Sequence, residues 1–169
     1  MRRFLIESDT GFLREAATLV DNRLDKLDRE AKSHPDPVGC GLMDSTEYII
    51  GFGFVACQTY ATAVSRWSDL NKGAWLKLGP KHRSGRPMIE LVNACANYWK
   101  HNQEWSSDSP SARAQKTIDI IASLGVDKSE PYPMFVALHQ ILDPHPARIK
   151  NLIPFLTQWQ DEVGPSRKG

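Results

Sequence analysis

Apolar residues recur every three or four positions along most of this chain, which is the spacing that gathers them on one side of an α-helix. The first such run covers about residues 9–32. Pro35 and Pro37 follow directly, and proline both blocks the continuation of a helix and restricts the residue before it. The pattern therefore predicts a long first helix that ends before these two prolines.

The second predicted segment starts at Asp44, and its run from Tyr48 to Trp67 is the most apolar part of the chain. Asp44 and Glu47 have the spacing of a capping box, with aspartate in place of serine or threonine. The alternation around Gly51 and Gly53 is also typical of a strand, but about 20 residues pass without any turn signal other than glycine, which favours a helix. The small residues of this helix would let a neighbouring backbone approach closely.

Proline, glycine and capping residues divide the rest of the chain into further helices. After a basic loop at residues 71–86, Pro87 stands where a first helical residue is favoured. The later helices are expected at about residues 87–103, 109–124 and 133–142, with a last one that ends near residue 163. Pro154 lies inside the last helix and should kink it.

These segments predict an all-α fold, an irregular bundle of about five to six helices. We expect one domain over residues 1–169, with a frayed tail at residues 164–169. A chain of this length can bury a core without disulfides or metals. Its three cysteines are far apart in the sequence, so they imply neither a disulfide framework nor a zinc ribbon.

The charge and the apolar runs narrow the classes of function. The formal net charge is +1, so no field of the whole molecule favours nucleic acid or acidic lipid, although a local basic patch is still compatible with it. The apolar stretch at residues 4–6 is too short for a signal-peptide core, and no uncharged run is expected to span a membrane. We expect a cytoplasmic protein without membrane contact, metal ion or cofactor.

The helix expected at residues 87–103 carries the most chemical information. Its polar side chains fall within a sector of roughly 100° and form one continuous face. They are Glu90, Asn93, Asn97, Lys100, His101 and Glu104. His101 is a candidate proton-transfer group, oriented by Glu104 or Glu90, because histidine titrates near neutral pH. Asn97 could hold a substrate oxygen or phosphate, and Lys100 supplies positive charge. The alternative interpretation is the ordinary polar face of a surface helix.

The segment Ala96–Trp105, Ala-Asn-Tyr-Trp-Lys-His-Asn-Gln-Glu-Trp, resembles helix segments of the HEPN-like superfamily. Members of this superfamily are small all-α proteins found in toxin–antitoxin and phage-defence systems. The resemblance covers this segment and the general helical layout. It implies a helical bundle that often dimerises, and it implies metal-independent ribonuclease activity for the active members.

The segment departs from the pattern of the active HEPN proteins, which is an arginine, four to six residues and then a histidine. Residues 94–96, where the arginine would precede His101, are Ala, Cys and Ala. The chain matches this spacing only from Arg29 to His34, and about one such match is expected by chance. His34 also precedes a proline at a helix end, which fits a stop signal better than a pocket.

The loop at residues 71–86 is a second candidate site. Lys81, His82, Arg83 and Arg86 stand near Trp75, and basic side chains beside an aromatic one can hold a nucleic-acid backbone and stack a base. The alternative is a solvated loop. The five tryptophans of the chain are expected in the core or at a protein–protein interface, for which Trp105 is the best candidate.

Three hypotheses on function follow. The first is a HEPN-like helical binding or regulatory protein, homodimeric, that meets RNA or a protein partner of a defence or toxin–antitoxin type system through the face at residues 97–104 and the basic loop. The second is a metal-independent ribonuclease in which His101 acts as general base or acid, assisted by Lys100 and Asn97. The third is a structural interaction subunit without chemistry. The sequence does not choose between an enzyme and a binding protein.

Overall fold

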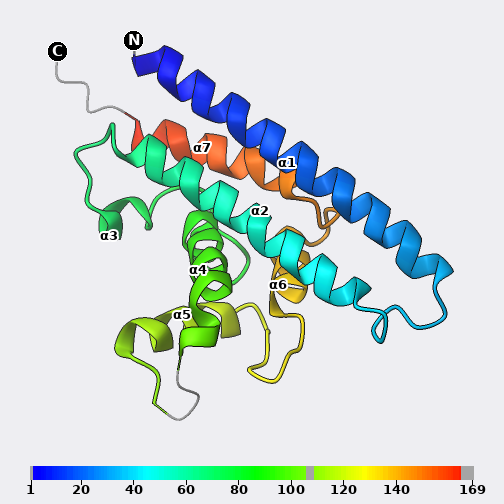
Figure 1. Cartoon of the computed structure of the whole chain (residues 1–169). Coiled ribbons are helices and arrows are strands. Elements are labelled where there is room, and N and C mark those ends of the chain that lie inside the picture. The colour runs from blue at the N-terminus through cyan, green and yellow to red at the C-terminus, as the bar shows by residue number, and fades with distance from the viewer. Residues whose placement is uncertain (1, 106–108, 165–169) are drawn as a thin grey trace.

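The computed structural model describes residues 2–105 and 109–164, and this part of the chain is built from helices alone (Figure 1). It contains seven α-helices, α1 to α7, two short 3₁₀ helices, η1 and η2, and no strand. The predicted all-α fold is confirmed, with slightly more helices than the expected five to six. Of the tail predicted at residues 164–169, all but Gly164 lies outside the described residues.

Two long antiparallel helices lie side by side and form the upper layer in Figure 1. α1 spans Arg2–Ser33 and α2 spans Leu42–Ser65. α1 begins earlier than predicted and ends just before Pro35, as the prolines indicated. A stripe of buried side chains at helical spacing joins it to the core: Leu13, Ala17, Val20, Leu24 and Leu27. The apolar periodicity of the sequence therefore marks the packing face of α1.

α2 is the central helix, and it packs against α1, α4, α6 and α7. Phe54 and Cys57 are fully buried, and burial raises the pKa of the Cys57 thiol to about 12. By its length and a mean hydropathy of 1.2 over 18 residues, α2 could also cross a membrane, which the sequence analysis did not expect. Half of that window is buried within the protein. A helix at the centre of a folded domain meets the same criteria.

Two glycines of α2 give space to side chains of other elements. A Cβ atom at Gly51 would lie 1.9 Å from Cδ1 of Trp99, and one at Gly53 would lie 2.5 Å from Cγ1 of Ile149. Side chains thus approach α2 closely at these two glycines, whereas a neighbouring backbone was expected there.

α4 spans Met88–His101 and lies beneath α2 in Figure 1. The short helix α3 (Lys72–Trp75) precedes it, and η1 (Asn102–Glu104) and α5 (Ala112–Ala122) follow it. Residues 88–96 are buried except for Glu90, which is half-buried. The first two turns of α4 are therefore enclosed on all sides, so the polar face predicted along the whole helix is open to solvent only near its C-terminal end.

Glu47 caps a different helix from the one predicted. α2 begins after Gly41, which adopts a left-handed φ of 76°, and no side chain caps α2. The two carboxylate oxygens of Glu47 instead accept the backbone N–H groups of Met134 and Phe135, each at 2.8 Å, at the start of α6 (Pro133–Leu142). Burial raises the pKa of Glu47 despite these bonds. The predicted capping box is wrong because this carboxylate serves a helix far along the chain.

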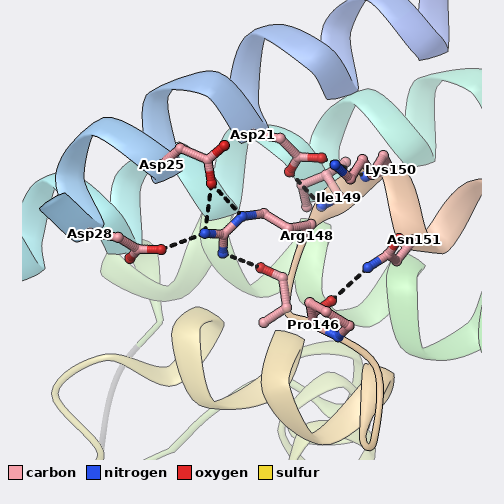
Figure 2. Close-up of polar contacts among 9 residues, drawn as sticks. Asp21, Asp25, Asp28, Pro146, Arg148, Ile149, Lys150 and Asn151 are labelled. Carbon is pink, nitrogen blue, oxygen red and sulfur yellow. Dashed lines mark hydrogen bonds and ion pairs between the residues drawn. The ribbon is translucent and has the colours of Figure 1, made fainter.

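A buried aspartate of α1 anchors the start of the last helical segment (Figure 2). Asp21 is 4% exposed, and its two carboxylate oxygens accept the N–H groups of Ile149 at 2.7 Å and Lys150 at 3.0 Å. These are the first residues of η2 (Ile149–Leu152). Burial raises the pKa of Asp21, although the two backbone bonds oppose that shift. Asp21 thus satisfies donors that a helix start would otherwise leave unpaired.

Arg148 extends this anchor along α1 (Figure 2). Its guanidinium donates to Asp25 at 2.8 Å and also binds Asp28. α7 (Ile153–Val163) follows η2 directly, with Pro154 in its first turn. The kink predicted at Pro154 is wrong, because proline is readily accommodated in the first turn of a helix, where its missing N–H costs no intrahelical bond.

Trp75 and Trp159 belong to the core, as the first interpretation expected, and the other three tryptophans are half-buried. Nε1 of Trp159 donates to the backbone oxygen of Trp75 at 3.0 Å, and both rings are buried in an edge-to-face contact. Trp105, the candidate for an interface, is half-buried and meets the ring of Tyr98 with 5.7 Å between centroids. α3 and α7 are therefore joined through the core, whereas the region of Trp105 is closer to the surface.

Candidate functional site

A single buried amide on α2 organises the polar residues of α4. Nε2 of Gln58 donates to the side-chain oxygens of Asn93 and Asn97, each at 2.9 Å. Nζ of Lys100 donates to Oε1 of the same amide at 2.6 Å. Gln58 was not among the residues predicted from the sequence, in which its one signal is an amide within the most apolar helix. Asn97 and Lys100 therefore stand on the side of α4 that meets α2.

His101 and Glu104 form a pair at the end of α4. Nδ1 of His101 lies 3.1 Å from Oε2 of Glu104, and the two side chains are 43% and 71% exposed. Nε2 of His101 has no hydrogen-bond partner within the described residues. This is the arrangement expected for an oriented imidazole, since the carboxylate fixes one nitrogen and the other is available to a ligand.

Glu90 does not belong to this group. It lies 3.0 Å from the guanidinium of Arg86 at the other end of α4. A separation of 11 residues corresponds to roughly 16 Å along a helix, which is beyond the reach of His101. Of the two carboxylates considered as partners for His101, only Glu104 is in place. Asn97, Lys100, His101 and Glu104 are brought together around the last turn of α4.

Two cations from other helices lie near Lys100: Lys72 of α3 and Arg113 in the first turn of α5. Partial burial and the positive charge of Arg113 lower the pKa of both lysines, and Lys100 adds to the effect on Lys72. Within the described residues, no carboxylate forms an ion pair with any of the three. Arg113 could not be predicted from the sequence, because only the fold brings α5 beside α4.

Three of the four loop residues predicted to bind nucleic acid contact the protein itself. Arg83 binds the carboxylate of Asp143 and a side-chain amide at the C-terminal end of α6. Nε2 of His82 lies 3.0 Å from a backbone oxygen of that end, and Arg86 binds Ser123 and a glutamate. Lys81 is exposed, and its side chain has no partner within the described residues. The loop arginines are thus largely neutralised, which leaves less charge for a nucleic acid.

Two surface hollows flank the C-terminal half of α4. One, of about 600 Å³, has Tyr48, Phe52 and Trp99 in its lining and is mostly apolar. The other, of about 240 Å³, includes Tyr98 and Trp105. None of the four candidate residues at the end of α4 lines either hollow. His101 and Glu104 are therefore exposed on a surface outside both hollows.

Large apolar side chains are exposed along one side of the α1–α2 hairpin. Phe12 and Leu19 of α1 are 67% and 62% exposed, and Tyr48 and Phe52 of α2 are 70% and 46% exposed. Spacings of seven and four residues place each pair on one side of its helix. Arg23 continues the line of Leu19 and lines the 600 Å³ hollow together with Tyr48 and Phe52. We call the four apolar residues the hairpin face.

The described residues contain no group of three or more His, Cys, Asp or Glu side chains that could hold a metal ion. Comparison of the chain with protein-family models, curated proteins and solved structures finds no match. The fold and the site together define an all-α protein with an exposed apolar hairpin and an open polar surface at the end of a central helix.

Proposed function

We propose that this chain is a helical binding or regulatory protein of the HEPN-like kind that acts as a homodimer joined through the hairpin face. The exposure of Phe12, Leu19, Tyr48 and Phe52 is the observation that carries the proposal. Contiguous exposed apolar patches on soluble proteins mark interaction sites. Full burial of one such side chain contributes about 1.5–3 kcal/mol, so the face can supply much of the free energy of association.

Charge favours a second copy as the partner of this face. Arg23 and Asp44 are exposed, line the same apolar hollow, and form no ion pair within the described residues. In a two-fold interface the same surface meets itself, so Arg23 of one copy can face Asp44 of the other. Such pairs contribute little affinity at an exposed edge, but they fix the orientation of the two copies.

Light scattering after gel filtration tests the dimer. We expect about twice the 19.0 kDa chain mass for the wild type, and the mass of one chain for Phe52→Glu at the same concentration. Val38→Glu is the matched control, because Val38 is also exposed but lies in the α1–α2 loop. Arg23→Asp should weaken the dimer and the added Asp44→Arg should restore it. A wild-type monomer at tens of micromolar would rule the dimer out.

A ribonuclease is the second candidate, and the pairing of His101 with Glu104 favours it. With Nδ1 held by the carboxylate, Nε2 of His101 could take the proton of a ribose 2′-hydroxyl or give one to the leaving oxygen. Lys100, next to His101 in the chain, would offset the charge that develops on the phosphate. Asn97 offers its amide as a further contact. The open surface is compatible with a long single strand.

The ribonuclease is tested by incubating the protein with total RNA in the presence of a chelator. Cleavage by the wild type should fall at least about a hundredfold in His101→Ala, the size of a general acid–base contribution. His145→Ala is the control, because His145 is exposed and lies beyond α6. Retention of RNA on a filter without cleavage would support the binding protein. Neither cleavage nor retention would leave the interaction subunit.

A further inference from the structure

The 240 Å³ hollow beside the end of α4 lies where α4, α5 and the segment after α5 meet. Four aliphatic side chains form part of its lining: Pro110, Ile118, Ile121 and Val126. Pockets for drug-sized ligands usually hold about 300–1,000 Å³, so the smaller volume of this hollow suits a ligand with a single ring system. We call it the α4–α5 hollow.

Two aromatic rings add to the wall of the α4–α5 hollow. Tyr98 of α4 and Trp105, which follows η1, meet edge to face, with 5.7 Å between the ring centroids and 83° between the ring planes. Both side chains are only half-buried, so aromatic surface remains open in the hollow. Nucleobases stack on aromatic side chains in this way, and the lining is therefore suited to a flat heterocycle.

A carboxylate and an amide supply polar groups to the same lining. Oδ1 of Asp127 accepts the backbone N–H of Ser129 at 2.8 Å and its hydroxyl at 2.6 Å, so the carboxylate is held in one orientation. These bonds lower the pKa of Asp127, which keeps the group ionised and therefore an acceptor only. Oδ2 of Asp127 and the side-chain amide of Asn102 have no hydrogen-bond partner within the described residues. The hollow thus offers a ligand one fixed acceptor and one group that can donate.

We propose that the α4–α5 hollow binds a guanine base. Guanine carries two neighbouring N–H donors, at N1 and N2, and the acceptor O6 along one edge, so Asp127 can accept from the donors while Asn102 donates to O6. Adenine has an unprotonated N1 in place of the N1–H of guanine, and its lone pair would face the lone pairs of the carboxylate. The carboxylate therefore selects guanine over adenine.

Lys128 extends the site beyond the base. It also lines the α4–α5 hollow, it is exposed, and it forms no ion pair within the described residues. Its ammonium is therefore available to the phosphate of a nucleotide. The base could belong to an RNA strand or to a free guanine nucleotide. The proposal holds whether or not the chain dimerises or cleaves RNA.

Titration calorimetry with guanosine and adenosine 5′-monophosphates tests the site. We expect the wild type to bind the guanosine nucleotide about tenfold more tightly, which corresponds to one charge-assisted hydrogen bond. Asp127→Asn should remove this preference, because Ser129 still holds Oδ1 and the new amide nitrogen then faces the N–H donors of guanine. Trp105→Leu should weaken both nucleotides about tenfold, whereas Trp105→Phe keeps an aromatic ring and should retain most of the affinity.

Asp36→Asn is the matched control for Asp127→Asn. Asp36 is also exposed and accepts a backbone N–H in a turn, but it lies in the α1–α2 loop. Circular dichroism shows whether each variant folds, and Asn102→Ala, which should weaken the guanosine nucleotide severalfold, decides the matter if Asp127→Asn does not. Equal affinity for this nucleotide in Asp127→Asn and Asp36→Asn, equal binding of both nucleotides by the wild type, or no binding at all would overturn the proposal.

An oligouridylate with one central guanosine distinguishes the two sources of the base. Tighter binding of this strand than of the free nucleotide, with the same loss in Asp127→Asn, would identify an RNA strand as the ligand. Weaker binding of the strand would identify a free guanine nucleotide. Either result supports the base site, because both require the carboxylate of Asp127.

Discussion

Replacement of Asp21 by alanine is expected to lower the free energy of unfolding by about 3 kcal/mol, because two buried or half-buried N–H groups lose their acceptor. The carboxylate is almost fully enclosed, so water cannot take its place without opening the contact between α1 and η2. For a protein of this size the loss corresponds to a fall of roughly 6–12 °C in Tm. Chemical and thermal unfolding measure both quantities.

Asp21→Asn and Asp25→Ala are the controls for this prediction. The asparagine retains one acceptor and should lose about half as much stability. Asp25 is exposed, and Arg148 keeps its bond to Asp28 when Asp25 is removed, so the second change should be much milder. A loss in Asp25→Ala as large as that in Asp21→Ala would contradict the anchor.

The difference in stability between the wild type and Asp21→Asn should depend on pH, and the sign of this dependence can be worked out. Burial raises the pKa of Asp21 in the folded state above its ordinary value of 3.8, so the folded protein holds this proton more tightly than the unfolded chain. Between those two pKa values the wild type loses stability as pH rises, whereas Asp21→Asn has no proton to release there. The stability of the wild type relative to Asp21→Asn should therefore fall as pH rises through this range.

Gly53→Val should destabilise the protein by about 3 kcal/mol, near the upper end of the usual cost of overpacking. The first added carbon would lie 2.5 Å from Cγ1 of Ile149, and Val20 is 3.4 Å away. Ile149 is fully buried and its backbone is bound by Asp21, so it has little freedom to move aside. The measurement is urea unfolding with the slope compared between variants.

Gly11→Val is the matched control. Gly11 lies in α1, and a Cβ atom there would have no atom within 4 Å. Both glycines are in helices, so the change in helix propensity is the same and amounts to only a few tenths of a kcal/mol. Gly11→Val should therefore leave stability within about 0.5 kcal/mol of the wild type. Equal losses in the two variants would show that crowding at Gly53 is not the cause.

Apolar spacing and proline positions were sufficient to predict the longer helices, because both act over a few neighbouring residues, but they missed the four-residue helix α3, which lies in the predicted loop at residues 71–86. The residues chosen for α6 agree with the structure, and the end of α1 before Pro35 agrees as well. The errors concern partners that are distant in the sequence. Glu47 has the local pattern of a capping box, but the fold places its carboxylate at the start of α6. Local spacing contains no information about such a partner.

In the candidate site, too, the contacts within one helix were predicted, whereas the partners from distant parts of the chain were not. Helical spacing correctly placed Asn97, Lys100 and His101 around one end of α4, and Glu104 at hydrogen-bond distance from His101. It could not reveal Gln58, which is 35 residues from Asn93 in the chain, or the approach of Arg113 from α5. Whether His101 acts in catalysis stays a prediction.

The bond between Asp21 and Ile149 joins positions 128 residues apart. As the ribosome makes the chain, α1 emerges long before its anchor exists, and α2 is the first partner available to its apolar stripe. The native packing of α1 is completed only when η2 has been synthesised and docks against Asp21. Until then, the part of α1 that η2 covers is open to chaperones and to aggregation.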